Sequence, residues 1–316
     1  MNVLLLSHQL DYSGAPIALL RLAEALIGQG HRVSLLSKQD GPLGIEFVKC
    51  GVQATDSNLA QYDLYFANTF LMVPLALELA PSEDKILAWI HESRAFFRLY
   101  GRDETQYGLS RLKRALFPSK FQIEEYRTLM PDCELRQLRN QVSMTGIQRS
   151  NSFADFFAVS GAWEPRKNQA GLLKLIDSAG LDIKLNFIGT GKPPSIPCAQ
   201  HHYFGQVSAL EAKRIIAGSC GLISAAINET QNLAAIESIL VGHPVLLSSI
   251  PAHQELQELI PSVVLFDATD AASFAEGFAS VTRLKSDSAH LDEGRDQAER
   301  YFGKAAFSEA LSPLIN

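Results

Sequence analysis

Short apolar runs alternate with longer amphipathic segments along almost the whole chain. Residues 3–6 form an apolar run of strand length, and Gly14 lies in the loop that we expect to follow it. Residues 16–27 then place Ile17, Leu20 and Ala23 on one face of a helix. This order is typical of α/β folds built on a parallel sheet. Further strands are expected at 32–36, 62–67, 85–90 and 115–118.

A second alternating set follows a polar stretch at residues 144–152. We expect its strands at 156–159, 183–188, 221–225, 244–247 and 263–266, and its helices near 168–178, 208–217, 231–241 and 270–283. The polar stretch predicts a linker between two Rossmann-like domains, residues 1–147 and 148–299. Two doubly wound sheets that face one another form a cleft at the carboxyl ends of their strands, where ligands bind.

Composition narrows the class of protein. The 316 residues are 47% hydrophobic and 20% charged, as in ordinary globular proteins, and the net charge of −6 argues against nucleic-acid binding through bulk positive charge. Cys50, Cys133, Cys198 and Cys220 form no C-x-x-C pair, so we expect reduced thiols and no metal site. The first residues lack the basic region of a signal peptide, which predicts a cytoplasmic protein.

The segment with the clearest chemistry contains two carboxylates eight residues apart, Glu229 and Glu237. If a helix begins near Gln231, Glu229 lies in the loop before it and Glu237 lies on it. The amides of Asn232 and Leu233 would then form an anion site at the helix N-terminus. A pair of Glu residues at this spacing is by itself weak support, because such pairs arise often by chance.

The surroundings of this pair add specificity. Together with Gly242-His243-Pro244 and Ile250-Pro251-Ala252-His253-Gln254-Glu255, the segment resembles the donor-binding half of glycosyltransferase family 4, retaining enzymes with the GT-B fold. Further segments resemble other family motifs: Glu164-Pro165-Arg166-Lys167-Asn168, Phe187-Ile188-Gly189-Thr190-Gly191, Tyr203-Phe204-Gly205-Gln206-Val207-Ser208, Ser13-Gly14-Ala15-Pro16 and Ile90-His91-Glu92.

The resemblance implies a role for each matching residue. Glu237 would hold the donor ribose, Glu229 the hydroxyls of the transferred sugar, and the amides of Asn232 and Leu233 the diphosphate. Lys167 would neutralise the leaving diphosphate, and His91 would reach the transferred sugar. The remaining residues expected at the donor are Gly14, Arg166, Gly189 and Val207. The resemblance further implies that the helix at 300–316 packs on the first domain, and that neither metal nor cofactor is needed beyond the nucleotide-sugar substrate.

Two departures from the family pattern leave alternatives open. Ala162 stands where the family has an arginine that binds phosphate, and Asn232 where it has a glycine. A GT-B accessory protein without turnover and a nucleotide-sugar epimerase are therefore the rival hypotheses.

Residues 94–149 hold eleven Lys or Arg against six Asp or Glu, a net charge of +5 in an acidic protein. Solvated helix faces are the ordinary explanation for such a window. The alternative is an acceptor-side surface that meets an anionic membrane, a lipid-linked glycan or another glycan acceptor, and that keeps the protein at the inner face of the membrane.

Overall fold

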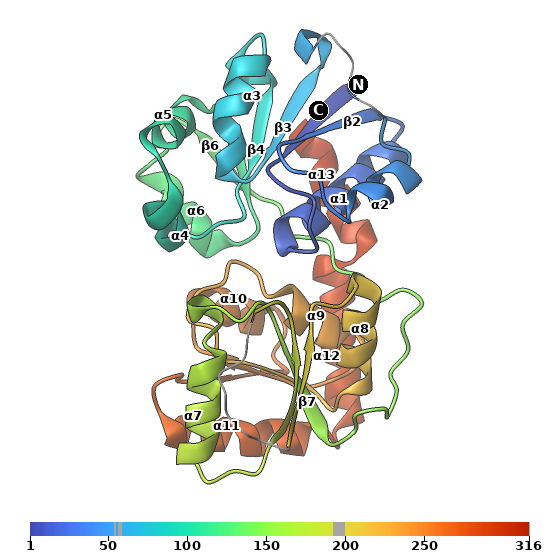
Figure 1. The fold of residues 1–316 in the computed structure, drawn as a ribbon, viewed down its shortest axis with the longest axis vertical. Helices are drawn as coiled ribbons and strands as arrows, with labels where there is room; N and C mark the ends of the chain where they lie inside the picture. Colours follow the sequence, from blue (N-terminus) through green and yellow to red (C-terminus); the bar gives the residue numbers. More distant parts are fainter. Residues whose placement is uncertain (54, 56–58, 192–199, 316) are drawn as a thin grey trace. The chain divides into compact units, whose positions relative to one another are not determined.

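The computed structural model describes residues 1–53, 55, 59–191 and 200–315 (Figure 1). The chain divides into two compact units, one of Met1–Gln141 with Phe307–Asn316 and one of Val142–Ala306. Each unit contains a six-stranded sheet in which every neighbouring pair of strands is parallel. The expected class of fold, doubly wound α/β, is confirmed.

The sheet of the first unit has the strand order β2-β1-β3-β4-β5-β6. Its strands are β1 (Asn2–Ser7), β2 (Arg32–Ser37), β3 (Leu64–Asn68), β4 (Ile86–Trp89), β5 (Arg114–Phe117) and β6 (Glu134–Gln137). After β1 the chain forms β2 on one side of β1 and then β3 on the other side. The topological switch point therefore lies between β1 and β3, and ligands of doubly wound sheets bind at the carboxyl ends of such strands.

Helices cover both faces of this sheet. They are α1 (Gly14–Gly28), α2 (Gly44–Lys49), α3 (Val73–Leu79), α4 (Arg94–Tyr100), α5 (Asp103–Arg111), α6 (Lys120–Arg127) and α13 (Lys304–Ile315), with 3-10 turns at Leu59–Gln61, Phe70–Met72 and Glu83–Lys85. Because successive side chains of a strand point to opposite faces, Leu4 and Leu5 enter different hydrophobic clusters. Helix α13 lies beside α1, where Gln29 donates to Ser308 and Ser312 (Figure 1).

The sheet of the second unit has the order β12-β11-β10-β7-β8-β9, so its switch point lies between β7 and β10. Its strands are β7 (Phe156–Ser160), β8 (Lys184–Ile188), β9 (His201–Gly205), β10 (Leu222–Ser224), β11 (Val245–Ser248) and β12 (Val263–Phe266). Its helices are α7 (Gln169–Ser178), α8 (Ala209–Gly218), α9 (Leu233–Leu240), α10 (Pro251–Leu259), α11 (Ala271–Leu284) and α12 (Ser288–Phe302), with a 3-10 turn at Pro165–Lys167.

Several local predictions differ from the structure. The edge strand β6 was not expected, because Glu134-Leu135-Arg136-Gln137 contains a single apolar residue and an edge strand needs few. Strand β9, which contains Tyr203, Phe204 and Gly205, was not among the expected strands. Gly14 is the first residue of α1, not a loop residue. Helix α9 begins at Leu233, two residues later than expected.

The boundary between the units also differs from the prediction. Val142 and Met144 pack in the core of the second unit, and the Val142 amide donates to the carbonyl oxygen of Phe302. The segment expected to be a linker therefore belongs to the second unit. At the other end, Phe302 packs in the second unit and Phe307 in the first, so the chain crosses back later than residue 300.

Cys198 lies outside the described residues. Within the described ranges, none of the helices combines the length and apolarity that crossing a bilayer requires.

Candidate functional site

Two cations converge on one buried carboxylate at the switch point of the second sheet. The Glu229 side chain is 7% exposed, and its Oε1 is paired with Lys167 Nζ. Arg166 Nη1 lies 3.4 Å from Oε2 of the same carboxylate. Burial alone would raise the pKa of Glu229, but the charges of Lys167 and Arg166 outweigh it and lower that pKa. The carboxylate is thus held in its ionised form.

The turn that carries both cations follows β7 and depends on a glycine. Gly161 has a φ of 140°, and a Cβ added there would lie 3.0 Å from Cε of Lys167. The Gln169 side chain donates to the main-chain oxygens of Gly161 and Ala162 and so closes the turn. Glycine at this position leaves room for the lysine to cross toward Glu229.

Asn168 connects this turn to the loop that bears Glu229. Its φ of 53° is left-handed, a conformation that Asn adopts more readily than most residues. Its Nδ2 donates to the main-chain oxygen of Ala225, which follows β10. A second bond joins the same segments, from the amide of Ile227 to the carbonyl oxygen of Arg166. The ends of β7 and β10 are therefore tied together around the ion pair.

A chain of buried polar groups fixes the N-terminus of α9. Asn232 caps the helix, since its Oδ1 accepts from the amide of Ala235, and its Nδ2 lies 3.1 Å from Nε2 of His253. His253 is fully buried, and its Nδ1 lies 2.7 Å from the main-chain oxygen of Ser248. The amides of Leu233 and Ala234 lie in the first turn of α9, where an amide has no acceptor within the helix, so they point out of the helix end and can meet an anion. Asn232 itself acts as the cap.

The second expected carboxylate, Glu237, lies in a different environment. It is on α9 and half-buried, and its Oε1 lies 3.7 Å from Nζ of Lys213 on α8. Lys213 also donates to the main-chain oxygen of Ser143. The two carboxylates are therefore paired with different cations, Glu229 with Lys167 and Arg166 and Glu237 with Lys213.

In the first unit, His91 follows β4 at the carboxyl edge of the sheet. Its ring packs against Trp89, with 4.5 Å between ring centroids, and its Nε2 lies 2.9 Å from Oδ1 of Asn68. Burial of the ring and the nearby His8 lower the pKa of His91 to about 3. His91 is therefore neutral at physiological pH.

The neighbouring carboxyl group behaves in the opposite way. Burial raises the pKa of Glu92 to about 7, although the amide of Phe70 lies 3.4 Å from its Oε2. Thr69 lies in the sequence between Asn68, the partner of His91, and Phe70, the partner of Glu92, and it is fully buried with a φ of 86°. A β-branched residue in this conformation is strained, and such strain is common near functional sites.

The other residues expected at the donor have structural contacts. Gly189 has a φ of 145°, and an added Cβ would lie 2.1 Å from the carbonyl oxygen of Gly161, so Gly189 lets two strand ends approach closely. Val207 packs against the core of the second unit, between β9 and α8. Gly14 opens α1, directly after the N-cap residue Ser13.

Sequence reasoning assigned no role to several polar residues that organise the two sites, although Asn168 and His253 lie within the motifs it quoted. These are Asn68, Asn168, Lys213, Ser248 and His253. The signal for Asn68 and Ser248 was a polar residue at the carboxyl end of an apolar run. For Asn168 it was an Asn directly after the basic pair, where a left-handed residue ends the turn.

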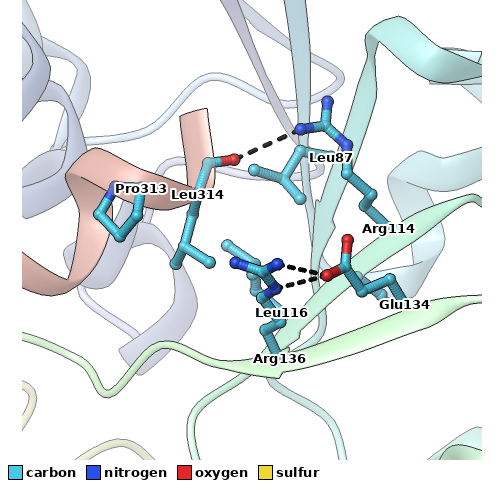
Figure 2. A pocket seen from close by; sticks show the side chains of 8 residues that line it. Leu87, Arg114, Leu116, Glu134, Arg136, Pro313 and Leu314 are labelled. Carbon is cyan, nitrogen blue, oxygen red and sulfur yellow. Dashed lines mark hydrogen bonds and ion pairs between the residues drawn. The ribbon is translucent and has the colours of Figure 1, made fainter. Parts of the chain in front are cut away.

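A pocket of about 100 Å³ lies elsewhere, at the amino-terminal edge of the first sheet (Figure 2). Arg114 donates there to the main-chain oxygen of Leu314, and Arg136 is paired with Glu134. Both guanidinium groups are therefore paired with groups of the same unit, and the pocket lies opposite the edge where such sheets bind ligands.

Among the described residues, no three His, Cys, Asp or Glu side chains gather in a way that could hold a metal ion.

The match to a protein-family model covers the first half of the chain. Residues 1–159 match the model of a protein family described as glycosyl-transferase family 4. The motifs that sequence reasoning found most specific lie beyond this match, as do the departures at Ala162 and Asn232. No curated protein sequence matches the chain.

Solved structures with low sequence identity share the fold. HepE from Anabaena, solved with UDP and glucose, is 14% identical, with a TM-score of 0.79 over 100% of this chain and 99% of that one. Sucrose-phosphate synthase from Thermosynechococcus elongatus is 17% identical, with a TM-score of 0.74 over 99% and 98%. WaaG, which acts in lipopolysaccharide biosynthesis, is 13% identical, with a TM-score of 0.68 over 100% of both chains. The fold is that of the GT-B glycosyltransferases.

Proposed function

Because this chain belongs to glycosyltransferase family 4, we propose that it moves a sugar from a nucleoside diphosphate sugar to a hydroxyl acceptor with retention of the anomeric configuration. The protein is a glycosyltransferase with the GT-B fold. The observation that carries the proposal is the convergence of Lys167 and Arg166 on Glu229 beside the N-terminus of α9.

The charges of this cluster suit a leaving diphosphate. When the bond between sugar and phosphate breaks, negative charge builds on the phosphate oxygens, and preorganised positive charge stabilises it. Lys167 and Arg166 supply two cations, and the first amides of α9 supply two neutral donors. Arg166 contacts the same carboxylate as Lys167. It can therefore serve as the second cation for the diphosphate, in place of the arginine that the family has at the position of Ala162.

The carboxylates would then hold the sugars. A bound diphosphate would draw Lys167 toward itself, and Glu229, still ionised, would accept hydrogen bonds from hydroxyls of the transferred sugar. Glu237 would accept from the ribose hydroxyls while Lys213 balances its charge. Since HepE was solved with UDP and glucose, UDP-glucose is the first donor to test.

The proposal requires no metal and no cofactor, because Lys167 and Arg166 carry the positive charge that a divalent ion supplies in other transferases. Turnover should therefore be unchanged by EDTA. Loss of turnover in EDTA, restored by added Mg²⁺ or Mn²⁺, would contradict this part of the proposal.

The first unit, which we propose binds the acceptor, exposes large hydrophobic side chains on two helices. On α4 and α5, Leu99, Tyr100 and Tyr107 are exposed at 77%, 58% and 65%, with Arg98 and Arg102 exposed beside them. We propose that this surface meets an anionic membrane that carries a lipid-linked acceptor, which would place the protein at the inner membrane face. Binding to phosphatidylglycerol vesicles, absent with phosphatidylcholine and lost in the double variant Leu99→Ser with Tyr100→Ser, would support it. Equal binding by the double variant would contradict it.

The enzymatic test follows release of nucleoside diphosphate from a panel of nucleotide sugars, with and without glycan acceptors. Wild type should release nucleotide from one donor in an acceptor-dependent way, and the new bond should keep the donor's anomeric configuration. Glu229→Ala should lower turnover about 100-fold or more, comparable with the loss of one transition-state hydrogen bond. An inverted product would overturn the retaining assignment.

The accessory-protein hypothesis is favoured by Ala162 and by the capping role of Asn232. It predicts that wild type releases no nucleotide from any donor. Ala162→Arg should then raise affinity for a nucleoside diphosphate if the phosphate site is used. An epimerase would instead convert or release the donor's sugar without any acceptor.

A further inference from the structure

The pocket of about 100 Å³ in the first unit lies beside the last turn of α13 (Figure 2). In the parallel register of β5 and β6, Arg114 stands opposite Glu134 and Leu116 opposite Arg136, so these four side chains share one face of the sheet. Leu314 of α13 lines the same pocket. All of its lining residues belong to the first unit, at the end of the sheet opposite to the strand ends where substrates are expected.

Much of the lining is apolar. Leu87 and Leu116 are each 1% exposed and belong to the hydrophobic cluster that includes residues of α13. Pro313 and Leu314 complete the apolar lining from the helix. The pocket is smaller than the apolar cavity of roughly 150 Å³ that holds benzene in another protein, so it suits a molecule of about four to six non-hydrogen atoms.

Arg114 brings to this pocket a positive charge that no carboxylate of the described residues neutralises. Its Nη1 lies 3.4 Å from the main-chain oxygen of Leu314, and its Nη2 donates to the main-chain oxygen of Asp84 at 3.0 Å. Both partners are uncharged carbonyl groups, and the end of α13 adds only the partial negative charge of a helix dipole. Since a guanidinium group has five N–H bonds, three of those of Arg114 remain for a ligand.

The second arginine of the pocket is already neutralised. Nε and Nη2 of Arg136 are both paired with Oε1 of Glu134, and each of these side chains is 49% exposed. Two positive side chains and one negative side chain therefore line the pocket, which gives it a net charge of +1. A ligand with one negative charge balances this net charge, whereas a dianion leaves an excess of negative charge next to Glu134.

We propose that this pocket binds a small monocarboxylate with a short aliphatic chain. The carboxylate accepts hydrogen bonds from the remaining N–H groups of Arg114, and the aliphatic chain packs on Leu87 and Leu116. A planar carboxylate matches the fork of guanidinium N–H groups, and such charged hydrogen bonds are roughly twice as strong as neutral ones. This site is separate from the proposed donor site and does not depend on the proposed function.

The test titrates butyrate into the full chain labelled with 13C at the leucine methyl groups. The methyl signals of Leu116 and Leu314, assigned with Leu116→Ile and Leu314→Ile, should shift in a saturable way. n-Butanol has the same aliphatic chain without the charge, and inorganic phosphate has the charge without the chain. Both should bind more weakly than butyrate.

Arg114→Gln should raise Kd for butyrate about 10-fold or more, the effect of losing hydrogen bonds to a charged group. Arg127→Gln is the matched control. Arg127 is also an exposed arginine paired with a glutamate, and it lies on α6, whose Tyr126 packs in the hydrophobic cluster on the other face of the sheet. Its loss removes the same charge from the first unit and should leave Kd unchanged.

Glu134→Gln gives a test that a folding defect cannot imitate. It removes the negative charge from the pocket, at a side chain that is half exposed, so it should lower Kd for butyrate about two- to fivefold, the effect of one exposed charge. Weaker or unchanged binding by Glu134→Gln would contradict the role given to the net charge.

The remaining outcomes also decide the proposal. It is overturned if butyrate shifts neither leucine signal, if n-butanol or phosphate binds as tightly as butyrate, or if Arg114→Gln and Arg127→Gln change Kd equally. Displacement of butyrate by a nucleoside diphosphate would overturn it as well, because the two sites would then be one. Failure of the proposed function has a different signature, since wild type would turn over no nucleotide sugar while butyrate would still bind.

Discussion

The carboxylate of Glu229 is buried against Lys167 Nζ, and the lysine side chain is itself only 17% exposed. An ion pair removed from water is costly to form and costly to break by removing one partner. The pair spans the switch point of the second sheet, since Lys167 follows β7 and Glu229 follows β10. In the absence of a donor, the positive charge of Lys167 is therefore held next to the ionised carboxylate of Glu229.

The first prediction concerns stability against pH. The folded-state pKa of Glu229 lies below its ordinary value, so its ionisation stabilises the fold above the unfolded-state pKa of about 4.3. That stabilisation is lost as the pH falls through the lower folded-state pKa. Glu229→Gln should therefore lower Tm at pH 7 and have little effect at the acid end. A difference in Tm that does not change with pH would contradict the assignment.

Gly161→Ala should weaken donor binding by displacing Lys167. The new Cβ would lie 3.0 Å from the lysine side chain, in a backbone conformation that favours glycine. Gly180→Ala is the control, because Gly180 also has a positive φ, 62°, and has no atom within 4 Å of an added Cβ. Both variants should lose stability. Only Gly161→Ala should raise Kd for the nucleoside diphosphate, measured by calorimetry, and equal Kd values would count against this role of Gly161.

His253→Gln should raise KM for the donor by loosening the cap of α9. His253 supports Asn232, whose side chain holds the helix N-terminus that would face the diphosphate. His243→Gln is a matched control near the other end of α9, where His243 is also buried and its Nε2 lies 3.1 Å from the carbonyl oxygen of Ala217. If both variants changed KM alike, the effect would be one of general stability.

Glu92 should destabilise the fold as the pH rises toward neutrality. Its folded-state pKa of about 7 is higher than in the unfolded chain, so the folded protein holds the proton more tightly. Stability should fall with rising pH between about 4.3 and 7. Glu92→Gln should remove this slope, so that Tm of the variant exceeds that of wild type more at pH 8 than at pH 5. Parallel Tm curves would show that Glu92 titrates normally.

Much of the fold could be predicted from the sequence, because buried parallel strands are near-continuous apolar runs. Residues 3–6 and 263–266 lie within or coincide with β1 and β12. The edge strands β6 and β9 lack such runs, so their pairing could be seen only in three dimensions. The polar stretch at residues 144–152 predicts a linker because two buried apolar side chains, Val142 and Met144, are too few to form a pattern.

The sequence predicts those parts of the candidate site whose residues lie close together along the chain. It does not predict contacts that arise only when distant segments meet in the fold. The spacing of Glu229 and the basic pair at Arg166 and Lys167 could be found along the chain. Their convergence could not, because it depends on β7 and β10 being neighbours in the sheet. The same holds for Asn68, which meets His91 only because β3 and β4 pair in parallel.

Binding of nucleoside diphosphates to wild type, Lys167→Ala and Lys174→Ala, measured by calorimetry, tests the central claim most directly. Lys174 is an exposed lysine on α7 and serves as the control for loss of one positive charge. The account predicts that one nucleoside diphosphate binds wild type and Lys174→Ala equally, and that Lys167→Ala binds it at least 10-fold more weakly, a loss of about 1.4 kcal/mol. Equal binding by all three proteins would contradict the assignment of the donor phosphates to Lys167.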